Sequence, residues 1–296
     1  LVALDWLVGP RGPGSSGSGG RGPSWVLLLI PNAAGKVTGG LLQLGLRALE
    51  RGFVPVIFNR RGHNGCPLTT PRLQPFGDSG DLREAVTYLR CRHPAALLLA
   101  VSEGSGSGLL LAYLGESGSS SRLAAAACIS PIFRGRDWFE AGMPWLYEWP
   151  LLLHLKRGLS RSVGSPGAGE GWGALGAPRP ALAGGEESPR HSRTGWVSKA
   201  PAPHWTPGAE QGQSPPCAAA CPPAPTPGVC PVGLPLELFR SSPYFFLLLT
   251  PRGGHCGFPR RGPGRCWGHE AVLEYFRAMA EFLRAEERRK GLPRPR

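Results

Sequence analysis

Ser102 lies where a predicted strand meets a predicted helix. Residues Leu97–Val101 form a short apolar run that predicts a buried strand, and an apolar helix is predicted over residues 107–115. A serine at such a turn can act as a nucleophile if the residues two before and two after it are small, because the turn is strained. Here those residues are Ala100 and Gly104. Ser102 is therefore a candidate nucleophile.

The Gly- and Ser-rich stretch 103–108 allows two other interpretations. It could be a flexible loop, or it could hold a phosphate group against the first turn of the following helix. The phosphate interpretation is the weaker one, because the stretch has neither the Lys and Thr of a Walker motif nor a complete G-x-G-x-x-G pattern.

His255 is the candidate general base. It lies in the loop 253–258, between the last predicted strand, 244–249, and the last predicted helix, 269–290. A loop in that place can carry an imidazole over the edge of a sheet, and the chain order of serine before histidine occurs in serine hydrolases. A purely structural role is the alternative for a single histidine.

The elements that would position these residues alternate along the first half of the chain. Short apolar runs predict strands at 25–30, 54–59, 97–101 and 124–129, and amphipathic patterns predict helices at 38–51, from 78 to before Pro94, and at 107–115. Apolar strands that alternate with helices indicate a mostly parallel sheet covered on both faces. The predicted fold class is α/β.

This pattern stops near Arg157. Residues 158–233 hold 14 Gly and 14 Pro among 76 residues, and few large apolar side chains. Such a composition buries too little apolar surface to offset chain entropy, so we predict disorder. The chain then divides into residues 1–156, a low-complexity segment at 157–233, and residues 234–296, which complete the first part. The abrupt junction also fits a frameshift or a retained intron in the gene prediction.

Composition excludes several classes of protein. The net charge is +13, but the cations form no stripe with interleaved aromatic residues, so nucleic-acid binding is not expected. The eight cysteines include no C-x-x-C pair, which argues against a zinc site or a disulfide framework, and we expect no metal and no cofactor. No apolar run reaches the roughly 18 residues that a membrane span needs. The chain begins at Leu1 without Met, so we expect a signal or anchor to be missing.

Several phrases together resemble the α/β-hydrolase subfamily of abhydrolase domain-containing proteins 1, 2, 3 and 15. The resemblance covers residues 1–156 and 234–296. It implies an α/β-hydrolase fold, a role in lipid metabolism with hydrolysis of esters or phospholipids, and a membrane-associated or secretory-pathway location. The phrases are Leu4-Asp5-Trp6, Phe58-Asn59-Arg60-Arg61-Gly62, Ser102 followed by Tyr113-Leu114-Gly115-Glu116, and Gly253-Gly254-His255-Cys256-Gly257-Phe258.

The resemblance also implies roles for particular residues. Ser102 takes the position of the nucleophile and His255 that of the general base, while the backbone of Asn32 and of Glu103 would supply the oxyanion donors. The expected partner is a lipid ester substrate or a regulatory protein, and a membrane surface could be reached through the missing N-terminal segment.

Departures from the subfamily pattern support a second hypothesis. No Asp follows Asp137, which leaves that residue as a weak candidate for the triad acid. Glu103 puts a carboxylate beside the expected oxyanion, and the Tyr-Leu-Gly phrase comes two residues later after Ser102 than in the subfamily. The chain is therefore either a serine hydrolase of lipid acyl esters or a hydrolase-fold regulator of lipid breakdown that binds a partner with little or no turnover.

Overall fold

The computed structural model describes part of the chain, and the statements below concern that part. It comprises residues 2–8, 25–66, 74, 76–133, 149–150, 152–153, 156, 217–221, 236–242, 244–250, 254–258 and 266–291. Asp137, the weak candidate for the triad acid, lies outside these residues.

A seven-stranded sheet forms the centre of the described fold, with the strand order β1-β3-β2-β4-β5-β6-β7. β1 runs antiparallel to β3, and every other neighbouring pair is parallel. The strands are β1 (Ala3–Trp6), β2 (Trp25–Ile30), β3 (Val54–Asn59), β4 (Leu97–Glu103), β5 (Ala125–Ile129), β6 (Cys217–Cys221) and β7 (Phe245–Leu249).

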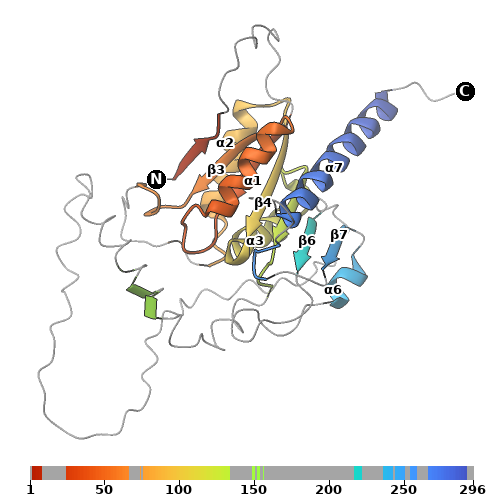
Figure 1. Ribbon diagram of the computed structural model, residues 1–296. Coiled ribbons are helices and arrows are strands. Elements are labelled where there is room, and N and C mark those ends of the chain that lie inside the picture. The colour runs from red at the N-terminus through yellow and green to blue at the C-terminus, as the bar shows by residue number, and fades with distance from the viewer. Residues whose placement is uncertain are drawn as a thin grey trace, which may run out of the picture.

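Helices cover both faces of this sheet (Figure 1). Helices α1 (Gly39–Glu50) and α7 (Trp267–Gly291) pack on one face, and α2 (Gly80–Arg92) and α3 (Ser107–Ser117) pack on the other. The shorter elements are the 3₁₀ turns η1 (Gly104–Gly106) and η2 (Gly118–Ser120) and helix α6 (Leu236–Ser241). The α/β fold class is thereby confirmed.

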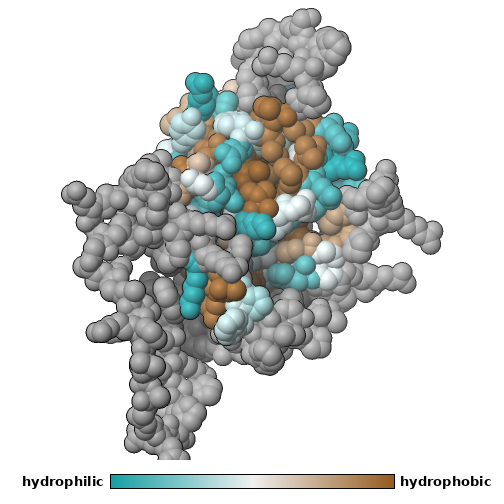
Figure 2. All heavy atoms as spheres, turned by 60° about the vertical axis from the view of Figure 1, so that its left-hand side comes forward, coloured by the Kyte–Doolittle hydropathy of each residue, from teal (hydrophilic) through white to brown (hydrophobic). Residues whose placement is uncertain are grey.

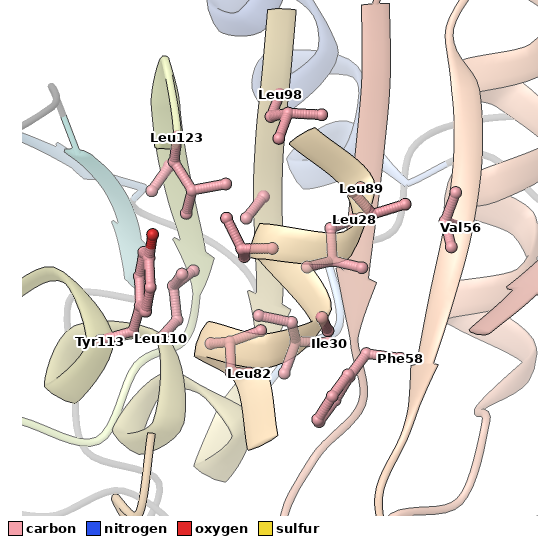
Figure 3. Packing of buried hydrophobic residues seen from close by; sticks show 14 of the residues in the cluster. Leu28, Ile30, Val56, Phe58, Leu82, Leu89, Leu98, Leu110, Tyr113 and Leu123 are labelled. Carbon is pink, nitrogen blue, oxygen red and sulfur yellow. The ribbon is translucent and has the colours of Figure 1, made fainter. Parts of the chain in front are cut away.

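Side chains from α2 and α3 pack against alternate residues of the central strands (Figure 3). Leu82 of α2 and Tyr113 of α3 lie over the same sheet face as Leu28 and Phe58, and all four are at most 2% exposed. The intervening strand residues, such as Leu29, point to the other face. Burial on both faces explains why these strands are continuous apolar runs in the sequence.

Strand β6 corrects one expectation. Residues Cys217–Cys221 fall inside the segment predicted to be disordered, yet they pair in parallel with both β5 and β7. Their sequence, Cys-Ala-Ala-Ala-Cys, is a short run of small apolar residues between pairs of prolines, and the average composition of the long segment hides it. The rest of residues 157–233 lies outside the described residues.

The carboxyl ends of β2, β4 and β5 meet at one edge of the sheet, because these strands are parallel neighbours. β2 lies between β3 and β4 in the sheet. The chain passes from β2 to β3 on one side and then crosses over to β4 on the other side, and ligands bind beside such a switch point in open α/β sheets. The loops that follow β2, β4 and β7 are the ones expected to carry functional residues. Among the described residues, no helix combines the length and the apolar character that crossing a membrane requires.

Candidate active site

Ser102 lies inside strand β4, which continues to Glu103. It pairs in register with Ile30 of β2 and Cys128 of β5, and its side chain is fully buried. The hydroxyl donates a hydrogen bond to Sγ of Cys128 at 3.3 Å. The predicted turn at Ser102 is therefore wrong, since the apolar pattern that ends at Val101 marks the end of large side chains and not the end of the strand.

The turn falls at Gly104. Its φ of +51° lies in the left-handed region that favours glycine, and the 3₁₀ turn η1 leads from it into α3. A Cβ atom built on Gly104 would lie 2.9 Å from Nε2 of His255 and 3.4 Å from Sγ of Cys256. The residue that faces the imidazole across the turn is thus a glycine.

The residues two before and two after Gly104 are both small. Ser102 packs against Cys128, as described above, and a Cβ atom on Gly106 would lie 2.4 Å from the carbonyl oxygen of Pro31. The stretch Ser102–Gly106 therefore has the small-x-X-x-small spacing of a nucleophile elbow, with Gly104 at its centre.

A sequence signal for this placement exists. The Tyr113-Leu114-Gly115 phrase comes two residues late when counted from Ser102, and this excess disappears when the count starts at Gly104. The excess arises only if Ser102, the serine at the end of the apolar run, is taken as the centre of the turn.

His255 reaches the sheet edge through a tight turn. Gly254 and Gly257 exchange two backbone hydrogen bonds, of 2.7 and 3.1 Å, and the turn between them carries His255 and Cys256. The amide of Cys256 donates to Oγ of Ser130 at 2.9 Å, and Ser130 directly follows β5. This contact fixes His255 beside the end of β4, where a general base would be required.

The imidazole of His255 lacks an orienting partner within the described residues. Its Nδ1 atom is buried and has no hydrogen-bond partner there. Burial lowers the pKa of His255, and the charge of Glu103 opposes this effect without reversing it. Burial thus favours the neutral form of His255, and no described carboxylate selects its tautomer as the triad acid of a serine hydrolase does.

The loops expected to form an oxyanion site do come together. The amide of Ala33, next to Asn32, donates to Oγ of Ser105 at 2.8 Å. Asn32 closes a tight turn by accepting the amide of Gly35 at 2.8 Å, and Glu103 precedes the turn within β4. The residue directly after the turn residue Gly104 is Ser105, so the amide of Ser105 stands where the amide of Glu103 was expected. The amide of Ala33 already has a hydrogen-bond partner in Oγ of Ser105.

The side chain of Glu103 points to the face of the sheet covered by α1 and α7. Its Oε2 atom accepts a hydrogen bond from Oγ1 of Thr38 at 2.9 Å, and its Oε1 atom lies 3.8 Å from Nε2 of His269. Thr38 also caps α1 by accepting the amide of Leu41 at 3.0 Å. Sequence reasoning missed Thr38 and His269, because they lie far from Glu103 in the chain and belong to no motif.

The described residues offer no group of three or more His, Cys, Asp or Glu side chains that could hold a metal ion. The described groups that lie together at the sheet edge include the imidazole of His255, the thiol of Cys256 and the backbone around Gly104.

Comparison with known proteins agrees with this architecture. The chain is 51% identical to human "Protein ABHD15" over 303 residues, which cover all of this chain and 64% of that protein. It is 36% identical over 105 residues to mouse "Phospholipase ABHD3", covering 35% of this chain and 26% of the mouse protein. No protein-family model matches the chain. The resemblance found in the sequence is confirmed, and the chain spans less than two thirds of the length of either relative.

Solved structures show the same fold at low sequence identity. An esterase from Thermogutta terrifontis superposes with a TM-score of 0.53 at 14% identity, covering 94% of each chain. The esterase Est1E from Butyrivibrio proteoclasticus gives a TM-score of 0.51 at 11% identity, covering 96% of this chain and 93% of Est1E. At these identities the comparison establishes the fold.

Proposed function

We propose that this chain, which belongs to the abhydrolase branch of the α/β-hydrolase family, is a hydrolase-fold regulator of lipid breakdown that binds a protein partner and has little or no ester turnover. The observation that carries this proposal is the glycine at the centre of the turn. Gly104 has no side chain to attack an acyl carbon, although His255 stands 2.9 Å from where its Cβ atom would be.

Two further features support low turnover. Nδ1 of His255 has no hydrogen-bond partner among the described residues, and losing the orienting acid costs about 10⁴ in kcat in serine proteases. The amide of Ala33, which follows the expected donor Asn32 in the same loop, is engaged by Ser105, so that amide is not available to a developing oxyanion. The first feature weakens the general base, and the second removes one possible oxyanion donor.

Apolar side chains at the surface support a binding role. Figure 2 shows hydrophobic side chains gathered at the centre of one face, with hydrophilic side chains around them. On β7, Phe246, Leu248 and Leu249 are between 42 and 50% exposed. Exposed apolar groups of this kind mark sites where soluble proteins bind a partner or a membrane.

The alternative is a serine carboxylesterase or lipase that acts on lipid acyl esters through Ser102 and His255. The position of His255 at the sheet edge favours it, as does the likeness to a relative named as a phospholipase. Against it, Ser102 is fully buried and shares no hydrogen bond with His255 among the described residues. A membrane-associated or secretory-pathway location remains a proposal for the whole protein.

Labelling with a fluorophosphonate probe separates the two functions. We expect no labelling of the wild type or of Ser102→Ala, and slow but detectable labelling of Gly104→Ser, whose new hydroxyl would face His255 although the orienting acid is still missing. Labelling of the wild type that disappears in Ser102→Ala would overturn the proposal and establish a serine hydrolase. Complete absence of labelling in folded Gly104→Ser, even after long exposure to the probe, would contradict the placement of the turn.

The regulatory half of the proposal is tested in cells that depend on this protein to control lipolysis. Wild type and Ser102→Ala should restore control of glycerol release equally, because the Ser102 hydroxyl contacts only Cys128 among the described residues. Loss of control in Ser102→Ala, at normal protein abundance, would show that turnover at Ser102 is required.

A further inference from the structure

Arg60 is a buried cation at the carboxyl edge of the sheet. It directly follows β3, and only 3% of the residue is exposed. Because β3 and β2 are parallel neighbours, Arg60 lies beside the loop that begins at Pro31 after β2. Ligands of open α/β sheets bind at this edge, next to the switch point. Arg60 belongs to neither the turn at Gly104 nor the His255 loop.

Two nitrogen atoms of the Arg60 guanidinium have no hydrogen-bond partner among the described residues. They are Nε and Nη2, and both are fully buried. These two atoms form one edge of the planar guanidinium, and each directs an N–H bond outward from that edge. Two parallel N–H donors match the two oxygens of a carboxylate or phosphate group. The unpartnered edge of Arg60 is therefore shaped for an oxyanion.

The next residue shows how the same edge binds a carboxylate. Nε of Arg61 donates to Oδ2 of Asp81 at 2.7 Å, and Nη2 of Arg61 donates to Oδ1 of the same side chain. On the other side of Arg60, Nδ2 of Asn59 donates to Oδ2 of Asp5 at 2.6 Å. Arg60 thus stands between two side chains with acidic partners and has no such partner within the described part of the chain.

The charge of Arg60 is not compensated by any described residue. Burial lowers the pKa of Arg60 to about 10, and no described carboxylate opposes this effect. The guanidinium therefore stays protonated at neutral pH. A buried charge without a partner is costly, and buried cations in folded proteins are paired as a rule. One negative charge at the unpartnered edge would supply that pair.

We propose that Arg60 binds the carboxylate of a monoanionic ligand through Nε and Nη2, in the geometry that Arg61 uses with Asp81. A carboxylate matches the single uncompensated charge, whereas the dianion of phosphate would leave an excess negative charge in buried surroundings. The interior next to this position is apolar, since Phe58, two residues earlier, belongs to the core under α2 and α3. The ligand class is therefore a carboxylic acid with an apolar chain.

This site goes beyond the proposed function and does not depend on it. Binding of a carboxylate at Arg60 needs neither a nucleophile nor a general base, so it is compatible with ester turnover and with its absence. The ligand would add a small-molecule input to a protein that otherwise acts through its partner.

Thermal unfolding of the full chain tests the proposal, with octanoate as the probe. A ligand that binds only the folded chain raises Tm, and we expect a rise of at least about 3 °C at saturating octanoate. Octanol has the same chain without the charge, and inorganic phosphate has the charge without the chain, so each should give a much smaller rise. An equal rise with octanol, a larger rise with phosphate, or no rise with octanoate would overturn the proposal.

Variants then assign the effect to Arg60. Arg60→Gln should abolish the octanoate rise, and Arg60→Lys, which keeps the charge but loses the two-atom edge, should weaken it. Arg47→Gln is the matched control, because Arg47 is exposed on α1 and pairs with Glu50 at 3.0 Å. It should keep the full rise. A rise that persists in Arg60→Gln would remove Arg60 from the site.

A second measurement, without ligand, tests whether the guanidinium is unpaired in the free protein. Arg60→Met keeps the length of the side chain and removes its charge, so its Tm should equal or exceed that of the wild type. Arg61→Met breaks the ion pair with Asp81 and should lower Tm clearly. A fall in Arg60→Met as large as that in Arg61→Met would show that a carboxylate of the chain itself pairs with Arg60, and it would overturn the proposal.

Discussion

Gly106 and Pro31 approach each other so closely that no side chain fits between them. A Cβ atom on Gly106 would lie 2.4 Å from the carbonyl oxygen of Pro31, which is backbone and cannot rotate away. Since Gly106 precedes α3 and Pro31 follows β2, this contact joins the two loops at the carboxyl edge of the sheet. The close approach holds the turn that contains Gly104 against the loop that follows β2.

Replacing Gly106 by alanine should destabilise the fold. The added methyl group overlaps the Pro31 carbonyl, and such overpacking costs about 1–3 kcal/mol. Gly39→Ala is the matched control, because a Cβ atom there meets nothing within 4 Å and the residue also lies at the start of a helix. Urea unfolding of both variants measures the difference, and equal midpoints would contradict the contact.

Removing the Ser105 hydroxyl should improve any activity installed at the turn. In Gly104→Ser, the amide of Ala33 is still engaged by Ser105, whereas in Gly104→Ser with Ser105→Ala that amide can donate to a developing oxyanion. One oxyanion donor is worth about 10²–10³ in rate at full effect, so we expect at least about tenfold faster hydrolysis of a short-chain ester. Ser105→Ala alone, which lacks a nucleophile, serves as the control and should stay inactive. Equal rates with and without Ser105 would show that the Ala33 amide does not reach the reacting oxygen.

The sheet and its helices could be predicted because their signals are local. The strands at Trp25–Ile30 and Val54–Asn59 are buried on both faces, so each appears in the sequence as a nearly continuous run of apolar residues. Strand β6 was missed for the opposite reason. Alanine and cysteine carry little apolar surface, and the five residues are outweighed by the prolines and glycines around them.

The centre of the site could be predicted only in part. His255 was found because a strand and a helix flank its loop. The turn was predicted at Ser102, two residues too early, because the nucleophile-elbow motif has a serine at its centre and the residue at the centre of this turn is Gly104. The contact that fixes the turn, between Gly106 and Pro31, joins residues far apart in the chain. The ion pair of His269 with Glu103 likewise joins α7 to the end of β4, residues far apart in the chain, and no local pattern encodes it.

Thr38 should contribute to stability through two hydrogen bonds made by one hydroxyl. It accepts the amide of Leu41 at the start of α1 and donates to Glu103. Thr38→Val keeps the shape but loses both bonds, and we expect a loss of about 1–2 kcal/mol in the free energy of unfolding. Thr38→Ser retains the hydroxyl and is the control, which should lose much less. Chemical denaturation would contradict the assignment if the two variants were equally stable.

His269 should remain protonated at a pH where His93 and His255 are neutral. Its pKa is raised to about 9, whereas burial lowers the pKa values of His93 and His255. An NMR titration of the ring resonances should therefore show a charged His269 at pH 8. In Glu103→Gln the midpoint should fall, because the attraction of the carboxylate is lost, and Cys91→Ala should leave it unchanged. A His269 midpoint at or below 6.5 in the wild type would contradict the ion pair.

The pair of Cys266 and His269 also predicts how stability depends on pH. The pKa of His269 is raised from 6.5 to about 9, so its contribution is complete below about pH 6.5 and is lost as pH rises through about 9. Burial would raise the pKa of the Cys266 thiol, but the interaction with His269 lowers it from 9.0 to about 7, so the contribution of Cys266 is complete above about pH 9 and is lost as pH falls through about 7. Between these values the folded pair and the unfolded chain hold the same number of protons, and the two slopes cancel.

Removing the thiol should expose the slope of His269. In Cys266→Ala the carboxylate of Glu103 still raises the pKa of His269, but no thiolate compensates, so the free energy of unfolding should fall with rising pH above about 6.5. Adding His269→Gln to this variant removes the titrating group and should restore a flat profile. Urea titrations at intervals between pH 6.5 and 9 provide the measurement. A flat profile in Cys266→Ala would mean that Glu103 alone does not hold a proton on His269.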